Sequence, residues 1–396
     1  MGKLMFSINS DSNSQFSPVL ADALKSHPSL KDKRIYEVVE DLKMALASPT
    51  ECEAPVLSVI KHLMTDKTIS VDYFSALNQM QSRQCRSHGS EFFTPTALAE
   101  FTVLSVIHQF IDIADRNPDE PLLVVEPSVG TGMMAMTFIR VLALHRPDLL
   151  QRVQLVVCDI NYNSLECFRL NYEIAQKKGL PLRDVIICHG SALEVLEPYV
   201  MQADLVIGNP PFHDVQLLDD TSIDLLSFYT NPCIEAVERG ELCQTKFSGK
   251  NKSKRRKSVN LAESITELSF RLLKPSGLGA LILPDGMLSN SKQQQIRQLF
   301  LEGSFDGISH NITSVVSFPS ESFKHSGTSV KTSCFIFGRG ESTDHVHFAQ
   351  IDKVGWDTRL RDTESELNIE EIAGFRQNLL SDYRLRSRKI EYKKAG

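Results

Sequence analysis

The chain has 396 residues, of which 42% are hydrophobic and 23% are charged, and its formal net charge is −6. This length predicts two or three domains, and the acidic balance excludes a protein that coats nucleic acid with its whole surface. No apolar run approaches the roughly 20 residues that span a bilayer, and the first residues lack the apolar core of a signal peptide. We therefore expect a cytoplasmic protein without membrane contact.

The eight cysteines are scattered along the chain, without a Cys-x-x-Cys pair or the spacing of a zinc site. Several lie inside apolar runs, such as Cys158 and Cys334. Such positions are typical of small buried hydrophobic residues in a reducing compartment. We therefore predict no metal site.

The N-terminal region, residues 1–85, is predicted to be a small helical domain. After a polar start, apolar residues recur at helical spacing, as in Val39, Leu42 and Leu46, and prolines mark turns between the helices.

From about residue 97 the sequence alternates between helices and short apolar strands. The expected elements are helix 96–114, strand 122–125, helix 132–145, strand 154–158, helix 163–178, strand 184–188, strand 204–207, helix 261–273, a turn at 275–277, strand 278–283, helix 291–301 and strands 312–318 and 330–337. This alternation is typical of an α/β fold with a doubly wound, mostly parallel sheet. We predict that this domain spans residues 86–340, with an insertion at about 213–260 and a polar C-terminal extension over 341–396.

The first candidate site is the turn after the first predicted strand, residues 126–132, with the sequence EPSVGTG. Gly130 and Gly132 let the backbone approach a ligand, at the sheet edge where open α/β sheets bind ligands. The turn lacks the full dinucleotide spacing and the lysine of a phosphate-binding loop. Glu126 suits a ligand with an amino group, which favours the methionine end of S-adenosylmethionine over NAD or ATP. The alternative is a purely structural turn.

Asp159 ends the second predicted strand. A carboxylate at this position can accept hydrogen bonds from both ribose hydroxyls of an adenosine. An isolated Asp after a strand is more often a loop or cap residue. The glycine turn that precedes it favours the ligand role.

The candidate catalytic loop is Asn209-Pro210-Pro211-Phe212, directly after the fourth predicted strand. The two prolines make the loop stiff. The side-chain oxygen of Asn209 and the carbonyl of Pro210 can accept hydrogen bonds from an amino group, while Phe212 offers a face to a flipped base. Because a ring-conjugated amino group is a poor nucleophile, two fixed acceptors would help by aiming its lone pair at a methyl donor. No metal is needed.

A basic run lies inside the predicted insertion. No acidic residue occurs between Glu241 and Glu263. The seven basic residues of this interval are Lys246, Lys250, Lys252, Lys254, Arg255, Arg256 and Lys257. Such a cluster can bind nucleic acid and release the counterions of its phosphates. The alternative interpretation is a solvated loop without a binding role.

With these motifs in this order, the chain resembles the N6-adenine DNA methyltransferases, and most closely the modification subunits of type I restriction systems. The resemblance covers roughly residues 85–375. Besides the motifs above, it rests on HGSEFFTP at 88–95, GALILPDG at 279–286 and the closing strands over 316–323 and 328–337.

The resemblance implies a Rossmann-like class I fold, S-adenosylmethionine as cofactor, and double-stranded DNA with a flipped adenine as substrate, in a bacterial, phage or plasmid-encoded protein. The implied cofactor-binding residues are Phe93, Thr94, Pro95, Glu126, Pro127, Ser128, Gly130, Thr131, Gly132, Asp159, Ile160, Ser191, Ala192 and Asn209. The catalytic residues are Asn209, Pro210, Pro211 and Phe212, and the nucleic-acid contacts are Lys250, Lys252, Lys254, Arg255, Arg256 and Lys257.

The chain departs from the family pattern at four points, one of which is an N-terminal helical region shorter than in typical type I subunits. The glycine turn begins with Glu126 where the family usually has Asp, and Gly190-Ser191-Ala192 stands where an acid often lies near the cofactor adenine. No segment after residue 340 is large enough for a separate target-recognition domain. DNA sequence choice is therefore expected from a specificity subunit or from residues 213–260.

Two other functions fit parts of the pattern. The Asn-Pro-Pro-aromatic loop also serves enzymes that methylate glutamine side chains or RNA bases. A non-catalytic DNA-binding or antirestriction component could retain the same fold. The Thr-Pro segment and the closing strands favour DNA as the substrate, and the complete motif set favours an enzyme.

Overall fold

The structure is a computed structural model that describes residues 17, 19–31, 33–68, 70–76, 92–216, 258–302, 304–305, 308–340 and 346–367. Three sequence predictions lie outside these residues. They concern the basic residues of 250–257, residues 88–91 of the HGSEFFTP segment and most of the insertion at 213–260.

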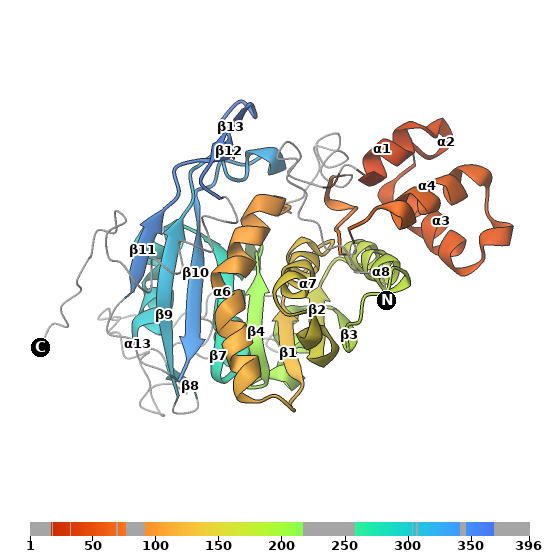
Figure 1. The fold of residues 1–396 in the computed structure, drawn as a ribbon. Helices are drawn as coiled ribbons and strands as arrows, with labels where there is room; N and C mark the ends of the chain where they lie inside the picture. Colours follow the sequence, from red (N-terminus) through yellow and green to blue (C-terminus); the bar gives the residue numbers. More distant parts are fainter. Residues whose placement is uncertain are drawn as a thin grey trace, which may run out of the picture.

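A central sheet organises the molecule (Figure 1). Its nine strands follow the order β11-β9-β10-β7-β4-β1-β2-β3, with β8 paired to β9. The strands are β1 (Leu122–Glu126), β2 (Val153–Asp159), β3 (Asp184–His189), β4 (Ala203–Gly208), β7 (Leu273–Pro284), β8 (Ser304–Phe305), β9 (Ile308–Ser317), β10 (Thr332–Arg339) and β11 (His347–Gln350). The strands β3, β2, β1, β4 and β7 are mutually parallel, whereas β10 is antiparallel to both β7 and β9. The predicted α/β class with a mostly parallel sheet is confirmed.

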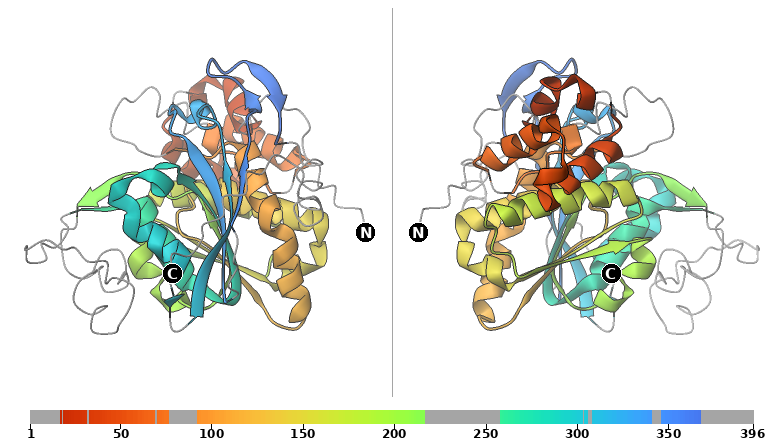
Figure 2. Two further views of the ribbon diagram at one scale, coloured as in Figure 1. Left: turned by 90° about the vertical axis from the view of Figure 1, so that its left-hand side faces the viewer. Right: turned by 90° about the vertical axis from the view of Figure 1, so that its right-hand side faces the viewer.

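Two apolar cores cover the two faces of this sheet. Because successive strand residues point to opposite faces, Val124 packs into one core and the adjacent Val125 into the other. The first core includes residues of α6 (Thr96–Arg116), α7 (Met133–His145) and α8 (Tyr162–Lys177). The second includes residues of α9 (Ala192–Val195), α11 (Leu261–Leu272) and α13 (Gln294–Glu302). Helices on both faces make the doubly wound arrangement seen in Figure 2.

The helix α6 is, by length and composition, apolar enough to cross a membrane, a property that the sequence prediction overlooked. It packs against α7 and β7, and 61% of its most apolar window is buried inside the fold. Its place against the central sheet accounts for its apolar composition.

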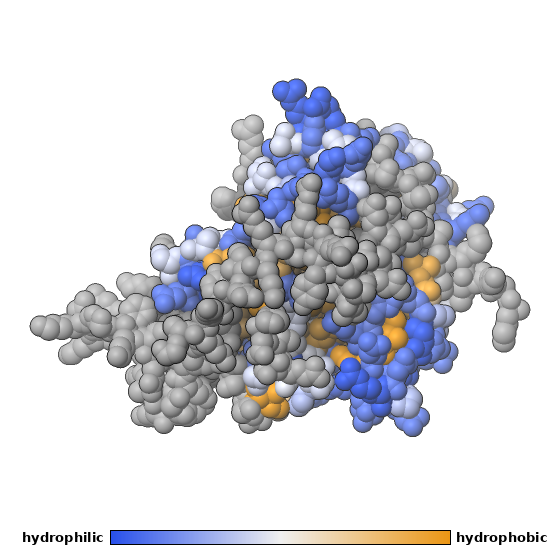
Figure 3. Space-filling model, turned by 60° about the vertical axis from the view of Figure 1, so that its left-hand side comes forward, coloured by the Kyte–Doolittle hydropathy of each residue, from blue (hydrophilic) through white to orange (hydrophobic). Residues whose placement is uncertain are grey.

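The exposed large hydrophobic side chains of the described residues are Tyr36, Met44, Ile160, Tyr162 and Val330. On the face drawn in Figure 3, the apolar residues form small separate patches.

The N-terminal helices form a smaller unit beside α8 (Figure 1). They are α1 (Val19–Lys25), α2 (Pro28–Lys31), α3 (Ile35–Ala47) and α4 (Ala54–Thr65). Their apolar side chains build a third core that Leu170 and Ile174 of α8 complete. An ion pair of 2.6 Å between Lys43 Nζ and Glu166 Oε2 also joins α3 to α8. The predicted helical character is confirmed for these residues.

The structure differs from the predicted elements in three segments, the last of which is the predicted polar extension after residue 340. The strand β7 begins at Leu273, and the turn predicted at 275–277 is an irregularity within it, where Leu273 pairs with Ala203 and Leu278 with Leu205. In addition, β5 (Asp214–Gln216) and β6 (Ser258–Asn260) pair as an antiparallel ribbon at the two ends of the predicted insertion. The C-terminal part contributes β11 to the main sheet and a hairpin of β12 (Val354–Trp356) and β13 (Asp362–Ser365).

Candidate functional site

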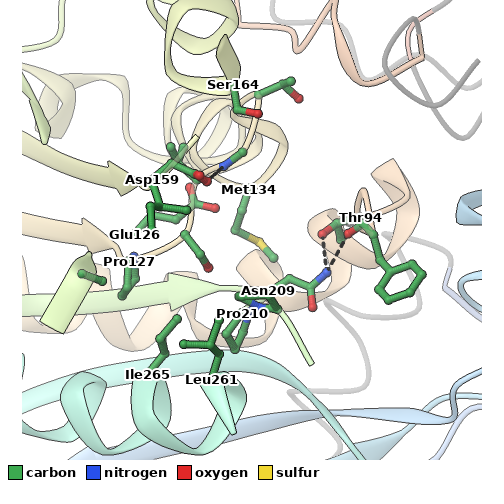
Figure 4. Close-up of a pocket in the computed structure, with 18 of the residues that line it drawn as sticks. Thr94, Glu126, Pro127, Met134, Asp159, Ser164, Asn209, Pro210, Leu261 and Ile265 are labelled. Carbon is green, nitrogen blue, oxygen red and sulfur yellow. Dashed lines mark hydrogen bonds between the residues drawn. The ribbon is translucent and has the colours of Figure 1, made fainter. Parts of the chain in front are cut away.

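A pocket of about 370 Å³ opens at the carboxyl ends of β1, β2 and β4. Ligands of open α/β sheets bind at this edge, because the loops that follow neighbouring parallel strands converge there. In Figure 4, Glu126 and Asp159 lie on one side of the pocket and Thr94 on the other, while Leu261 and Ile265 of α11 lie below. The pocket therefore brings together segments that are far apart in the sequence.

Most of the predicted site residues line this pocket. They are Phe93, Thr94, Glu126, Pro127, Ser128, Gly130, Thr131, Asp159, Ile160, Ser191, Ala192, Asn209, Pro210, Pro211 and Phe212. Two predicted residues do not line it, namely Pro95, which is the N-cap of α6, and Gly132. A Cβ atom on Gly132 would lie 2.5 Å from Phe168 Cδ2, so this glycine is required for packing between α7 and α8.

The glycine turn and the Asp159 loop are tied together through their backbones. Gly130 and Gly132 have φ angles of 54° and 107°, which are unfavourable for residues with a Cβ atom. The backbone N–H of Gly130 donates to Asp159 Oδ2 at 2.8 Å, and that of Asn161 donates to Asp159 Oδ1 at 2.8 Å. A carboxylate oxygen has two lone pairs, so these two hydrogen bonds do not by themselves prevent Asp159 from contacting a ligand.

Glu126 is a buried acid in this pocket. Its side chain is only 2% exposed, and Oε2 has no hydrogen-bond partner among the described residues. Burial raises the pKa of the Glu126 carboxyl well above its usual range, and the nearby carboxylates of Asp159 and Asp72 raise it further. No lysine or arginine is among the described residues that line the pocket. The site is therefore built for a ligand that brings hydrogen-bond donors and positive charge.

Asn209 follows β4 and is held in one orientation by the Phe92-Phe93-Thr94 segment. Its Nδ2 donates to Thr94 Oγ1 at 2.9 Å and to the carbonyl of Phe92 at 3.4 Å (Figure 4). Because a carbonyl oxygen can only accept, the amide nitrogen must face this segment. Asn209 Oδ1 is then left buried and without a partner among the described residues. This oxygen can accept a hydrogen bond from a ligand, and buried polar atoms are rarely left unpaired without a function.

Several residues of the pocket lining were not predicted from the sequence. They are Ser75, Phe92, Val129, Met133, Met134, Ser164, Gly190, Leu193, His213, Leu261 and Ile265. Met133 and Met134 begin the helix after the glycine turn, and their position there could have indicated that they line the pocket. Leu261 and Ile265 are one helical turn apart in a predicted helix, and this spacing could have indicated the same. Ser75 gave none, because tertiary structure alone brings it to the site.

The ribbon of β5 and β6 joins the candidate catalytic loop to α11. The backbone N–H of Leu261 donates to the carbonyl of His213 at 3.0 Å, and Asn260 Nδ2 donates to Asp214 Oδ1 at 2.9 Å. Because β5 and β6 are paired, residues 217–257 leave and rejoin the described fold only a few residues from Phe212 and Leu261. The basic residues that end at Lys257 are thus connected to this edge of the pocket by the chain itself.

The chain is similar to known methyltransferases in sequence and in fold. The family model for N-6 DNA methylase matches residues 67–387. A comparison with curated proteins gave no significant match. Among solved structures, a candidate class I S-adenosylmethionine-dependent methyltransferase from Listeria monocytogenes matches 89% of this chain and 96% of its own, with a TM-score of 0.58 at 15% identity.

Two further solved structures come from type I restriction systems. The methyltransferase subunit from Streptococcus thermophilus matches 91% of this chain and 69% of its own, with a TM-score of 0.54 at 17% identity. The modification subunit from Vibrio vulnificus matches 84% of this chain and 62% of its own, with a TM-score of 0.54 at 15% identity. At these identities, the likeness shows a shared fold.

Proposed function

The chain belongs to the N-6 DNA methylase family, and from this premise we propose that its pocket binds S-adenosylmethionine and that residues 209–212 present the N6 amino group of a DNA adenine for methylation. One observation carries the assignment of the catalytic loop. The buried Oδ1 of Asn209 has no partner among the described residues, while its Nδ2 is fixed by Thr94 and Phe92. An acceptor held in this way fits an incoming amino group.

The pocket fits the proposed cofactor chemically. S-adenosylmethionine supplies an electrophilic methyl group on a sulfonium, together with an ammonium group and an adenosine. The acid-lined pocket, whose described residues include no lysine or arginine, suits that positive charge, and Glu126 Oε2 suits the ammonium. In this proposal Asp159 accepts hydrogen bonds from the ribose, and Ile160, which lines the same pocket and is 75% exposed, offers an apolar surface to the adenosine.

The residues of the catalytic loop would orient the target amine. Asn209 Oδ1 and the carbonyl of Pro210 accept hydrogen bonds from the two N–H groups of the target amine. These hydrogen bonds withdraw the nitrogen lone pair from ring conjugation and direct the lone pair at the methyl group. In the transfer, the nitrogen would form the new N–C bond as the bond between sulfur and the methyl group breaks, which leaves that bonding pair on a neutral thioether sulfur. The nitrogen would then lose one proton to water, because an amide and a carbonyl oxygen are not bases. Phe212 lines the pocket and can stack on the base. Positioning supplies the rate enhancement, without a metal.

Adenine must leave the DNA helix to reach a loop that lines a pocket, so the proposed substrate is duplex DNA with a flipped base. The basic residues 250–257 supply the electrostatic part of DNA binding in this proposal. The choice of target sequence falls to a specificity subunit or to the 213–260 insertion, in a restriction-modification system or a related defence or mobile element. DNA as substrate implies a cytoplasmic location.

Asn209→Ala tests the catalytic assignment. We expect methylation to be lost, whereas cofactor affinity measured by calorimetry should stay within about a few-fold, because Asn209 acts on the target amine. Near-normal turnover would refute the assignment.

Thr94→Val tests how Asn209 is held. The valine removes the acceptor that orients the amide, so kcat should fall by about tenfold, the equivalent of one hydrogen bond of about 1–1.5 kcal/mol. Thr94→Ser retains the hydroxyl and should restore the rate. Equal rates for Thr94→Val and Thr94→Ser would show that Thr94 does not position Asn209.

A further inference from the structure

One wall of the pocket comes from the N-terminal part of the chain. Ser75 lines the pocket although it lies 56 positions before Thr131 of the glycine turn, which its hydroxyl contacts at 2.8 Å. Both hydroxyls also donate to one oxygen of Asp72, a residue only 3% exposed; the bond from Thr131 measures 2.6 Å. Residues 72–75 and the glycine turn therefore share one buried polar cluster.

The second oxygen of Asp72 is fully engaged as well. It accepts from the backbone N–H groups of Phe74 and Ser75 at 3.0 and 3.2 Å and from Asn171 Nδ2 at 3.0 Å. Asn171 also donates to the carbonyl of Thr131 at 2.9 Å. This shell fixes the carboxylate in place and leaves Asp72 Oδ2 to the two hydroxyls.

The number of protons decides what the hydroxyls can offer to a ligand. Each hydroxyl has one proton, and donating it to Asp72 Oδ2 leaves only lone pairs. A ligand that reaches these two hydroxyls would therefore find acceptors only. In its ionised form, Glu126 Oε2 in the same pocket is a third acceptor, without a partner among the described residues.

A primary ammonium has three N–H donors and one positive charge, which matches three acceptors in a pocket lined by acids and by no lysine or arginine of the described chain. We propose that the hydroxyls of Ser75 and Thr131, oriented by Asp72, form with Glu126 the subsite for the α-ammonium group of the cofactor. This inference rests on the proposed function. Ser75 is then a binding residue, and Asp72 is a positioning residue.

The test compares two ligands that differ only in this ammonium group. S-adenosylhomocysteine carries the α-amino group, and its desamino analogue keeps the carboxylate, sulfur and adenosine. Calorimetry would measure both affinities for the full-length wild-type chain and for Ser75→Ala, Thr131→Val and Thr131→Ser. Ser70→Ala is a matched control, because Ser70 lies in the same segment and donates to the carbonyl of Met136 at 2.6 Å without lining the pocket.

We expect Ser75→Ala and Thr131→Val to weaken S-adenosylhomocysteine binding by about tenfold or more, as for a hydrogen bond to a charged group. The same variants should bind the desamino analogue as the wild type does. Thr131→Ser keeps the hydroxyl and should bind S-adenosylhomocysteine more tightly than Thr131→Val does. Ser70→Ala should leave both affinities within about twofold, which is less than one such hydrogen bond contributes.

Equal losses for both ligands would overturn the inference, because they would show that the substitutions distort the pocket as a whole. Unchanged affinities would overturn it too. Thermal unfolding of each variant identifies any that fails to fold. If Ser75→Ala fails to fold, the comparison of Thr131→Val with Thr131→Ser still tests the ammonium subsite. If the wild type binds neither ligand, the proposed cofactor is wrong, which is a different result from any of these.

Discussion

Asn209, Thr94 and Glu126 illustrate what single residues contribute to the proposed chemistry. The motif around Asn209 predicted an acceptor for an amino group. Its orientation depends on the Phe92 carbonyl and the Thr94 hydroxyl, which come from a segment more than 100 residues away. The family resemblance predicted that Thr94 binds the cofactor, and this stays a prediction. The structure shows that Thr94 contacts Asn209 directly.

Glu126 predicts a pH dependence of cofactor binding. In the free protein, burial raises the pKa of this carboxyl well above its usual range, so the acid holds a proton at pH values where an exposed Glu has lost it. A bound ammonium favours the ionised form and lowers that pKa. Binding should therefore release a proton, and affinity should rise with pH up to the raised pKa and level off above it.

Calorimetry of S-adenosylhomocysteine in buffers of different ionisation enthalpy measures this proton release. Glu126→Gln should abolish it and bind more weakly at the upper end of the range. The raised pKa also means that Glu126 reduces the stability of the free protein as pH rises from the ordinary carboxyl pKa towards the raised one. A cofactor affinity of the wild type that does not vary with pH would contradict this account of Glu126.

Local elements were predictable where hydrophobic periodicity and turn chemistry agree. The strand β1, the glycine turn and α7 follow from an apolar run, two glycines and a helical pattern in direct succession. The turn predicted at 275–277 occurs as a bulge inside β7, where Ser276 has a φ of 66°, because tertiary pairing of Leu273 with β4 extends the strand across it. The three-residue strands β5 and β6 are too short to give a periodic signal, and their partners lie on either side of the insertion.

The two glycines of the turn should differ in their effects. Gly132→Ala places a Cβ atom 2.5 Å from Phe168 Cδ2 at a φ of 107°, and left-handed strain and overpacking together should lower the free energy of unfolding by roughly 2–4 kcal/mol. Gly130 has a φ of 54° with nothing within 4 Å of its added Cβ, so Gly130→Ala should cost only about 1 kcal/mol of strain.

Urea unfolding measures both substitutions. Because Gly130 lines the pocket and Gly132 does not, cofactor affinity should fall for Gly130→Ala even though that variant is the more stable of the two. Equal stabilities would show that Phe168 yields to the new methyl group, and the packing role of Gly132 would be wrong.

The basic run is tested at the level of the insertion. Replacing Lys254, Arg255, Arg256 and Lys257 by Gln should weaken DNA binding and flatten its salt dependence, by about 0.9 in the logarithmic slope for each phosphate that the variant no longer neutralises. These residues lie outside the described structure, but the paired strands β5 and β6 connect their segment to the catalytic loop. Cofactor affinity is the internal control and should not change. A salt slope equal to that of the wild type would leave the run as a solvated loop.

At the scale of the whole molecule, the alternating strands and helices predicted the fold class, and the sheet order confirms it. The packing of the N-terminal helices was not predictable. Their apolar residues could have formed an independent domain, but Leu170 and Ile174 of α8 belong to the same core, and Asp72 joins the glycine turn through Thr131. Ser75 therefore reaches the pocket by long-range contacts, which no local pattern encodes.

We propose that this chain methylates adenine in DNA at N6. The most direct test incubates the purified chain with plasmid DNA and S-adenosylmethionine that carries a labelled methyl group, followed by nucleoside analysis. We predict label in N6-methyladenine with the wild type and none with Asn209→Ala. Label in cytosine, or no label in adenine despite measured cofactor binding and DNA binding, would contradict the claim.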